Sequence, residues 1–419
     1  MQYLVFEDEK VPRLKPLVNL KPVYGLYTGF RSLAEKLEDT VASGIHLTWH
    51  LRAYIAPFYR EQHPDRMVNR IDDDELFLIN GRLICDEAVA GMIIEGGLSS
   101  GSALMQGDNL LFARIRRRQL PVISGNGGLP DLLDTQMLAA GLSVQQAEGF
   151  RIIEHLWDVI TFHADAMQQD AVSLEFGILE GDIHPSVAIV NRSNIYIAPG
   201  AVVKAGAVLD AEEGFIGIGA GAVVEPQAVL MNNVFLAPWS RVKAGARVYS
   251  NVFVGKASKV GGEVEDSIVE PFANKQHDGF LGHSYISSWC NLGAGTNTSD
   301  LKNNYSSVSL LVDGHEVSTG LQFLGLLMGD HAKCSINSMF NTGTIAGTGA
   351  NIFGGGFPPK EIGSFSWGSA TGGFAPYVID KAVETARKVM ERRQVAMSDA
   401  YETMFRFVAA MEHGRKMFL

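Results

Sequence analysis

Residues 274–296 bring together side chains that could take up a proton and stabilise a negative charge. His277 and His283 stand six residues apart in a loop with glycine and aspartate, and Asn291 opens a glycine-containing turn. Histidine is the side chain best suited to accept a proton near neutral pH. Asparagine amides and the N–H groups of a turn can donate to a developing oxyanion. A base beside such donors is what acyl transfer to an amine requires.

The elements that must position these side chains are set by a six-residue repeat. Neither an α-helix nor an ordinary strand has this period, whereas a parallel β-helix has one short strand per hexad. The same spacing occurs earlier at Ile183, Ile189 and Ile195. Small or polar residues fill the intervals between eight aliphatic positions that stand six apart: Ile218, Val224, Leu230, Leu236, Val242, Val248, Val254 and Val260.

Three hexads per triangular coil would stack residues eighteen apart along the axis. Ile218, Leu236 and Val254 would then form one internal ladder, and a second ladder would follow from Val224, Val242 and Val260. No coil can bury its apolar row alone, so neighbouring coils must stack. Each fully buried Val or Leu contributes roughly 1.5–3 kcal/mol. The sequence therefore predicts a left-handed parallel β-helix of the hexapeptide-repeat type.

Residues 1–177 contain no hexads and are expected to form a separate domain. Short strands alternate there with helical patterns, which predicts an α/β domain with a largely parallel sheet. The expected strands are Tyr3–Phe6, Leu47–Ile55 and Leu76–Ile79, and the expected helices are Arg31–Val41 and Arg151–Met167.

The β-helix is expected over residues 178–375. We expect an irregular excursion near Gly261–Asn274 and a loop-like segment, Phe353–Gly373, that closes the solenoid. Residues 376–419 form the third part. Apolar residues at i, i+3 and i+4 from Val378 to His413 predict an amphipathic C-terminal helix that packs as a cap along the solenoid.

Composition narrows the classes of function. Lys and Arg number 35 against 46 Asp and Glu, a net charge of −11 that argues against nucleic acid or an anionic membrane as the main partner. The cysteines Cys85, Cys290 and Cys334 are far apart, which favours reduced thiols over a disulfide framework. No apolar run approaches a transmembrane length, and the first residues do not read as a secretory signal. We expect a cytoplasmic protein.

The loop and turn around the two histidines resemble the acetyltransferase half of the bifunctional enzymes that make UDP-N-acetylglucosamine. In that family a His, followed three residues later by Tyr, precedes an Asn-Ile-Gly-Ala-Gly-Thr turn by fourteen residues. Here His277 lies fourteen residues before Asn291, and Phe280 stands at the Tyr position. Asn304-Tyr305 resembles the family's Asn-Tyr substrate loop, displaced along the chain. The whole chain looks like the alternative, Bacteroidetes/Chlorobi-type version of the enzyme.

The resemblance implies N-acetylation of glucosamine 1-phosphate by acetyl-CoA, coupled to nucleotidyl transfer that gives a UDP-sugar. It implies a homotrimer, because the acyl-CoA sites of such solenoids usually lie between neighbours. His277 would be the general base and Asn291 the oxyanion or amide-positioning donor. His283 is a second candidate base, because its surroundings partly mimic the motif. The substrate contacts implied are Lys275, Phe280, His283, Asn304 and Tyr305.

The N-terminal part departs from the usual sugar nucleotidyltransferase pattern. That family begins with a glycine-rich loop whose N–H groups hold the triphosphate. Here the first strand runs into Glu7-Asp8-Glu9-Lys10 without a glycine, so Arg13 and Lys15 are the candidates for phosphate binding. Asn80 and Arg82 stand near the place of the family's magnesium aspartate. We expect Mg²⁺ if this domain is active, with ligands that the sequence does not identify.

Three alternatives remain open at this point. The chain could be an acetyltransferase with a degenerate nucleotidyltransferase domain, or a non-catalytic regulator that binds nucleotide sugars. It could also be a metal-dependent hydratase, although the spacing of its histidines matches no zinc pattern. The histidines that would supply such ligands are His277, His283, His315 and His331.

Overall fold

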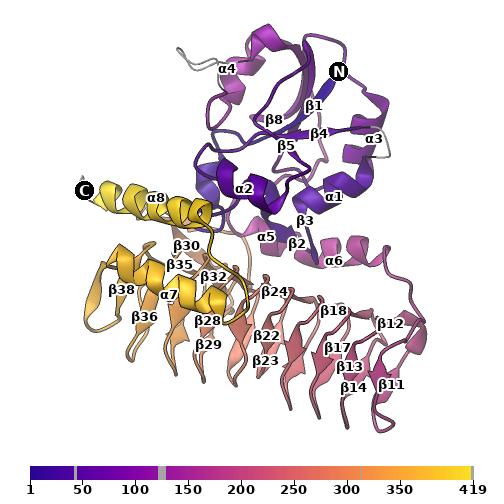
Figure 1. The fold of residues 1–419 in the computed structure, drawn as a ribbon, viewed down its shortest axis with the longest axis vertical. Helices are drawn as coiled ribbons and strands as arrows, with labels where there is room; N and C mark the ends of the chain where they lie inside the picture. The colour runs from indigo at the N-terminus through magenta and orange to yellow at the C-terminus, as the bar shows by residue number, and fades with distance from the viewer. Residues whose placement is uncertain (42–44, 121–128, 313, 417–419) are drawn as a thin grey trace. The chain divides into compact units, whose positions relative to one another are not determined.

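A computed structural model of the protein describes residues 1–41, 45–120, 129–312 and 314–416 (Figure 1). The chain forms two compact units. Unit 1 comprises Met1–Leu26, Arg31–Leu156 and Ser398–Phe407. Unit 2 comprises Tyr27–Phe30, Trp157–Met397 and the chain from Val408 onward.

Unit 1 is built on a seven-stranded mixed sheet with the strand order β5-β4-β1-β6-β8-β7-β9. The strands β5, β4, β1 and β6 run parallel, whereas β8 is antiparallel to both of its neighbours. The expectation of a largely parallel sheet is therefore correct, because β7 pairs parallel with β9 and only β8 in this sheet runs against the other strands. A two-residue turn containing Gly107, at φ +60°, joins β7 to β8, and so short a connection requires antiparallel strands. The strands are β1 (Gln2–Phe6), β4 (Leu47–Trp49), β5 (Met67–Val68), β6 (Glu75–Asn80), β7 (Ser102–Gln106), β8 (Asn109–Arg116) and β9 (Ser143–Gln146).

The predicted helix at Arg31–Val41 is confirmed as α1 (Leu33–Thr40). A reciprocal capping box between Ser32 and Glu35 stabilises its first turn. The helix predicted over Arg151–Met167 is wrong in its first half. Residues around Ile152 are extended there and pair with Leu83. The predicted strand Leu47–Ile55 ends at Trp49. The other helices of unit 1 are α2 (Ala56–Gln62), α3 (Glu87–Glu95), α4 (Thr135–Ala139), η1 (Val11–Leu14), η2 (Val23–Gly25) and η3 (Arg117–Gln119).

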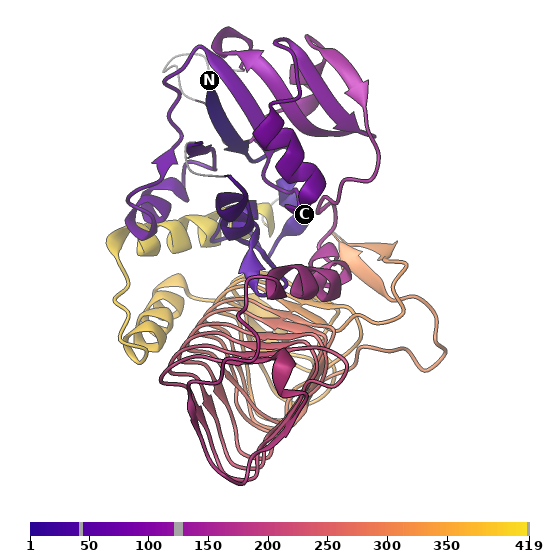
Figure 2. The same cartoon turned by 90° about the vertical axis from the view of Figure 1, so that its right-hand side faces the viewer.

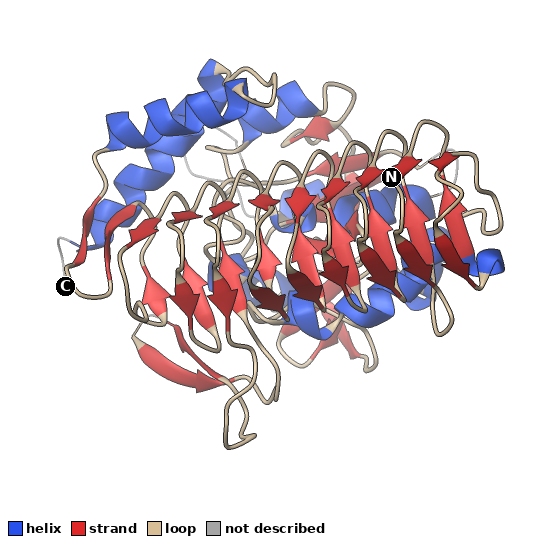
Figure 3. Cartoon of the chain, turned by 90° about the horizontal axis from the view of Figure 1, so that it is seen from below, coloured by secondary structure: helices blue, strands red, loops and turns tan. Residues whose placement is uncertain are grey.

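Unit 2 is a left-handed parallel β-helix whose coils superimpose when seen along the axis (Figure 2). Its first face has eleven strands: β10 (Asp182–Ile183), β13 (Val202–Val203), β16 (Val223–Val224), β19 (Arg241–Val242), β22 (Lys259–Val260), β25 (Asn274–Lys275), β28 (Asn291–Leu292), β33 (Lys333–Cys334), β36 (Asn351–Phe353), β38 (Ser366–Ser369) and β39 (Gly373–Pro376). The second face has six: β11 (Ala188–Val190), β14 (Val208–Asp210), β17 (Val229–Met231), β20 (Arg247–Val248), β23 (Glu263–Glu265) and β26 (Phe280–Gly282). Figure 3 shows the strands of successive coils side by side.

The third face has nine strands: β12 (Ile195–Ile197), β15 (Ile216–Ile218), β18 (Val234–Leu236), β21 (Val252–Val254), β24 (Ser267–Val269), β27 (Tyr285–Ile286), β32 (Leu326–Met328), β35 (Thr344–Ala346) and β37 (Glu361–Ile362). The predicted ladders are confirmed, since Ile218 pairs with Leu236, and Leu236 with Val254. Val224, Val242 and Val260 pair likewise on the first face. All six side chains are fully buried. The remaining short elements of unit 2 are β2 (Tyr27–Thr28), β29 (Asn297–Thr298), β34 (Met339–Phe340), η4 (Arg192–Asn194), α5 (Asp158–Thr161) and α6 (His163–Ala171).

The expected excursion at Gly261–Asn274 is wrong. That coil keeps its three strands and is only shorter, because Val260 pairs with Lys275 fifteen residues on. The solenoid is interrupted later, where an antiparallel hairpin of β30 (Ser309–Val312) and β31 (His315–Ser318) projects from the coils (Figure 2). The segment Phe353–Gly373, expected to be loop-like, continues the coils through β37 and β38.

The C-terminal segment contains two helices where one was predicted. They are α7 (Ile379–Glu391) and α8 (Asp399–Lys416). The first helix, α7, does not continue into α8 because Gln394 adopts a left-handed conformation, at φ +60°. The Val395 N–H then donates a hydrogen bond back to the Met390 carbonyl. Among the described residues, no helix combines the length and apolar character needed to cross a membrane. The three cysteines are free thiols, as predicted.

Candidate functional site

A pocket of about 330 Å³ lies between the first face of the solenoid and α7. It contains four cationic side chains, and no carboxylate is among the described residues that line it. The solenoid contributes Lys259, Phe272, Asn274, Gln276, Cys290, Asn291 and Lys333, and the helical segment contributes Thr385, Val389, Arg392 and Arg393. We call this site the α7 pocket. Its charge suits an anionic ligand.

The polar floor of the α7 pocket follows from strand alternation. On the first face, Val242 and Val260 point into the core, so the residues before them point outward. The outward row places Lys259, Asn274, Asn291 and Lys333 in register on successive coils. Burial is the main cause that lowers the pKa of Lys333, to about 8. The pKa of Lys259 is lowered by burial and then by Arg393, Arg241 and other cations.

Asn291, the predicted oxyanion donor, lies in this row. Its side-chain oxygen accepts a hydrogen bond of 2.7 Å from the Asn274 amide nitrogen. The Asn274 amide oxygen is buried and has no hydrogen-bond partner among the described residues. Unsatisfied buried polar atoms are rare in native proteins, and this one belongs to a residue that lines the pocket. A bound ligand with a donor group would satisfy it.

His277, the predicted base, stands at the corner between β25 and β26. Its side chain is exposed, and its Nε2 lies 3.3 Å from Nε2 of Gln276, a residue that lines the α7 pocket. The structure therefore places His277 one side chain away from the pocket that contains Asn291. Lys275, a predicted substrate contact, points inward instead and is 2% exposed. Its ammonium group donates to the main-chain carbonyls of Gly261 and His277.

His283 stands at a different corner of the coil, between β26 and β27. Its Nδ1 lies 2.9 Å from Asp300 Oδ2, its Nε2 lies 3.7 Å from Asp266 Oδ2, and its ring stacks on Phe323. Burial opposes the charged form of His283, but the two carboxylates outweigh burial and raise its pKa. A raised pKa leaves a smaller fraction of the neutral ring available to accept a proton at a given pH.

Asn304 and Tyr305 lie in the loop that follows Asp300, the residue that contacts His283, and neither of them lines the α7 pocket. Asn304 lines an open pocket of about 400 Å³ with Ser299, Leu301, Lys302, Asn303, Asn341 and Thr342. Tyr305 is 67% exposed. Phe280 is half-buried in β26, and its N–H donates to the Asn297 side chain. The residues predicted to form one site are thus divided between two corners of the solenoid.

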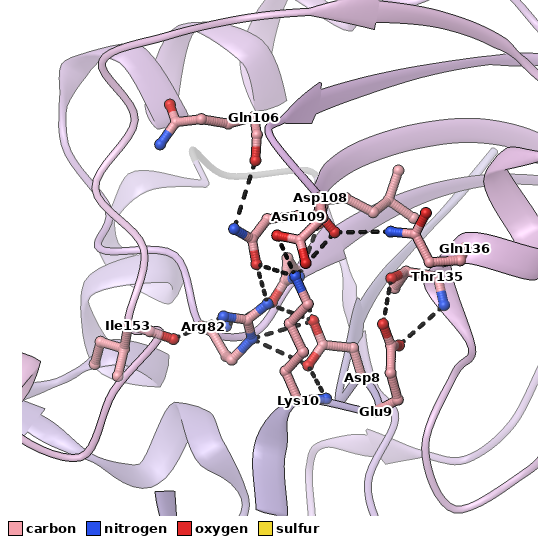
Figure 4. A network of polar contacts seen from close by, with 12 residues as sticks. Asp8, Glu9, Lys10, Arg82, Gln106, Asp108, Asn109, Thr135, Gln136 and Ile153 are labelled. Carbon is pink, nitrogen blue, oxygen red and sulfur yellow. Dashed lines mark hydrogen bonds and ion pairs between the residues drawn. The ribbon is translucent and has the colours of Figure 1, made fainter. Parts of the chain in front are cut away.

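In unit 1, the residues near the end of β1 form a buried charged network (Figure 4). Asp8 and Arg82 are both fully buried and form an ion pair of 2.7 Å. Asn80 donates to Asp8, and Arg82 also donates to Asn109 and to the Ile153 carbonyl. The predicted nucleotide contacts Asn80 and Arg82 are therefore occupied by partners within the protein.

The other charged groups at this end of β1 are also engaged. Glu7 pairs with buried Arg52 at 3.0 Å, and Glu9 accepts hydrogen bonds from Thr135. Lys10 is 4% exposed and pairs with Asp108 at 2.7 Å, and its hydrogen bond lowers the Asp108 pKa. Carboxylates with cationic or hydroxyl partners do not fit a Mg²⁺ site, which needs their oxygens as ligands.

Arg13 and Lys15 differ from this network in their exposure. Arg13 is exposed within η1, and Lys15 is half-buried just after it. In the part of the chain that the structure describes, no three His, Cys, Asp or Glu side chains are grouped so as to hold a metal ion. His277, His283, His315 and His331 thus form no such cluster.

Residues 3–177 match the family described as sugar nucleotidyl transferase. The bifunctional sugar-1-phosphate nucleotidylyltransferase/acetyltransferase of Sulfurisphaera tokodaii is 30% identical over 108 residues, which cover 25% of this chain and 27% of that protein. The bifunctional protein GlmU of Methanococcus vannielii is 28% identical over 118 residues, 28% of this chain and 27% of that protein. The chain thus spans about a quarter of the length of these relatives.

Among solved structures, the Francisella novicida UDP-N-acetylglucosamine acyltransferase is similar over 51% of this chain and 74% of its own, at 16% identity and a TM-score of 0.30. The acetyltransferase domain of PglB from Neisseria gonorrhoeae, in complex with acetyl coenzyme A, overlaps 42% of this chain and 73% of its own, at 19% identity and a TM-score of 0.21. At these TM-scores the overlap does not bear on function.

Sequence reasoning did not identify the four cations of the α7 pocket. Lys259 and Lys333 occupy the outward position next to inward-facing residues, so the hexad register could have placed them on one face. Arg392 and Arg393 lie inside the predicted C-terminal helix but directly follow α7 in the structure, and only the folded chain brings them to that face.

Proposed function

We propose that the protein transfers an acetyl group from acetyl-CoA to the amine of glucosamine 1-phosphate. The observation that carries this proposal is the α7 pocket, which combines Asn291 with four cations in a solenoid of the hexapeptide-repeat type. Acetyl-CoA and a sugar phosphate are both anionic, and cationic side chains bind phosphate through charge-assisted hydrogen bonds.

The proposed reaction needs one base and one set of donors. His277 takes a proton from the amine as the amine nitrogen attacks the thioester carbonyl carbon. The Asn291 amide donates to the oxyanion that forms. The C–S bond then breaks, and the CoA thiolate leaves and takes up a proton. His277 suits the role because its ring is exposed beside a pocket residue.

We further propose that unit 1 carries nucleotidyl transfer, which would give a UDP-sugar. The family match over residues 3–177 supports this proposal. Arg13 and Lys15 are the proposed phosphate contacts, because both follow β1 and their side chains are exposed or half-buried. A second candidate, an acetyltransferase with a degenerate nucleotidyltransferase domain, is favoured by the pairing of Asp8 with Arg82 at the place of a metal-binding carboxylate.

A coupled assay tests both reactions. Purified protein is given UTP, glucosamine 1-phosphate, acetyl-CoA and Mg²⁺, and each is omitted in turn. Free CoA, read with a thiol reagent, reports acetyl transfer, and pyrophosphate reports nucleotidyl transfer. CoA release without pyrophosphate would support the alternative with a degenerate nucleotidyltransferase domain. If neither product forms, the remaining alternative is the non-catalytic regulator.

We also propose that the protein is a cytoplasmic homotrimer. Light scattering on purified protein tests the assembly, and a monomer mass would reject the trimer.

A further inference from the structure

We propose that α7 supplies Arg392 and Arg393 to the phosphate groups of the acyl donor within the same chain, so that the donor site is complete in one subunit. This inference rests on the proposed acetyl transfer. It gives the C-terminal helix a binding role beyond that of a cap. It also separates this protein from solenoids whose acyl-CoA site is shared between neighbouring subunits.

The first observation is how the two arginines are held. Arg393 donates a hydrogen bond of 2.7 Å to the Ala257 carbonyl at a corner of the solenoid. This bond fixes the end of α7 against the first face. The pKa of Arg393 is lowered by burial and then by Arg392. Arg392 is exposed and lines the pocket, and no carboxylate forms an ion pair with it among the described residues.

The second observation is that these cations face others. Lys259 and Lys333 line the opposite wall, and the cationic neighbours that lower the pKa of Lys259 include both arginines. Like charges this close repel each other, and they persist only with some compensation. Along the same outward row, Arg241 has such compensation from Glu225 at 2.6 Å, whereas the pocket contains no described carboxylate.

The helix dipole does not account for this arrangement. It favours cations at the C-terminal end of α7, which would explain the arginines taken alone. It does not explain why Lys259 and Lys333 are placed across from them on a separate element. Four cations on two walls fit a ligand with several negative charges. Acyl-CoA has a pyrophosphate and a ribose phosphate at one end and its thioester at the other, so the arginines and Asn291 would bind different ends.

The first experiment compares two acetyl donors. The variant Arg392→Ala/Arg393→Ala should raise the KM for acetyl-CoA by about 10- to 100-fold, the loss typical of hydrogen bonds to charged groups. The KM for S-acetyl-N-acetylcysteamine, a thioester without phosphates, should not change. Lys381→Ala/Lys388→Ala removes two exposed cations from the same helix outside the pocket and should change neither KM.

The two donors also separate recognition from folding. Arg393 anchors α7, so its loss could displace the helix, but a displaced helix would impair both donors. Arg392→Ala alone leaves that anchor in place and should still raise the KM for acetyl-CoA. Equal losses for both donors, or no change for acetyl-CoA, would overturn the inference.

The second experiment asks whether the site is shared. Two differently tagged chains are co-expressed, one with His277→Ala and one with Arg392→Ala/Arg393→Ala, and assemblies that carry both tags are purified. A donor site complete in one chain predicts no recovery of activity at low acetyl-CoA, because each chain lacks one function. Recovered activity would show that the arginines act on a neighbouring subunit. If the wild-type protein is monomeric and active, the site is complete in one chain without this test.

Calorimetry with CoA itself distinguishes a failure of the proposed acetyl transfer from a failure of the proposed phosphate contacts. Wild-type protein should bind CoA, and Arg392→Ala should weaken that binding about 10-fold or more. If the wild type binds CoA in this way but transfers no acetyl group, the proposed function fails while the phosphate site stands. If the wild type transfers acetyl groups and Arg392→Ala binds CoA normally, only the further inference fails.

Discussion

The ammonium group of Lys275 lies 2.6 Å from the main-chain carbonyl oxygen of His277, inside the solenoid. Lys275 occupies an inward position in register with Val260, and a second hydrogen bond of 2.9 Å joins it to the Gly261 carbonyl. A buried ammonium is costly unless its hydrogen bonds are satisfied. The two carbonyls meet this need, and the lysine in return ties two successive coils together at the corner that presents His277.

The first prediction concerns Lys275 as a positioning residue. Lys275→Met should lower kcat for acetyl transfer by about 10- to 100-fold with little change in KM, because a small displacement of a reacting group has a large effect on rate. Steady-state kinetics on acetyl-CoA would measure this. Lys256→Met, an exposed corner lysine, is the matched control and should retain full kcat. Unchanged kcat in Lys275→Met would show that the corner holds His277 without it.

The second prediction concerns stability as a function of pH. Burial lowers the pKa of both Lys275 and Lys333 to about 8, below the ordinary value of 10.5. Between these values the unfolded chain binds more protons than the folded chain, so the free energy of unfolding should rise with pH from about 8 to 10. Urea unfolding at a series of pH values would measure this rise. Lys275→Met should show a smaller rise, and an identical rise would contradict the assignment.

The third prediction concerns the solenoid core. Leu230 is fully buried in β17, and its neighbour Met231 points outward and is half-buried. Leu230→Ala should lower the free energy of unfolding by about 2–5 kcal/mol, because the stacked coils cannot close the cavity. Met231→Ala, on the same strand, should lower it much less. Thermal unfolding of both variants would test this, and equal losses would contradict the inward register.

The hexads predicted the solenoid because each inward position repeats along the chain, and the pairings of Ile218 and Val224 with their ladder partners confirm that register. They failed where the period changed. The coil at Gly261–Asn274 is short by three residues yet keeps its strands, because Val264 and Val269 still occupy the core. An expectation based on a fixed six-residue period therefore predicts an interruption where the coil is only shorter.

The candidate site was harder to predict because its parts come from distant segments. Motif spacing selected His277 and Asn291, but it also made Lys275 a substrate contact. The strand alternation of β25 instead points Lys275 into the solenoid. The sequence made Arg82 a candidate phosphate contact because it stands near the place of the family's magnesium aspartate. Its partner Asp8 follows β1, whereas Arg82 follows β6, and only the pairing of these two strands brings the residues together.

The fourth prediction concerns this buried pair. Arg82→Met should destabilise unit 1 by about 3–5 kcal/mol, because it leaves the Asp8 carboxylate buried without its counter-charge. The double variant Asp8→Leu/Arg82→Met should recover part of that loss. Hydrogen exchange of peptides from β1 and β6 would measure local stability in both variants. If Arg82→Met left exchange unchanged but abolished nucleotide binding, Arg82 would be a ligand contact after all.

The last prediction separates the two histidines. His277→Ala should lower acetyl transfer by about 10²–10⁴-fold, the usual loss when a positioned base is removed. His283→Ala should have a smaller effect, because Asp300 and Asp266 raise the pKa of His283 and so leave less of its neutral ring to accept a proton. His283 should instead contribute stability that is complete at acidic pH and is lost as the pH rises through its raised pKa. Acetyl transfer assays and unfolding curves on both variants, each between pH 5 and 9, would measure these effects. Loss of transfer in His283→Ala with full activity in His277→Ala would move the base to the corner that contains Asp300, next to the loop of Asn304.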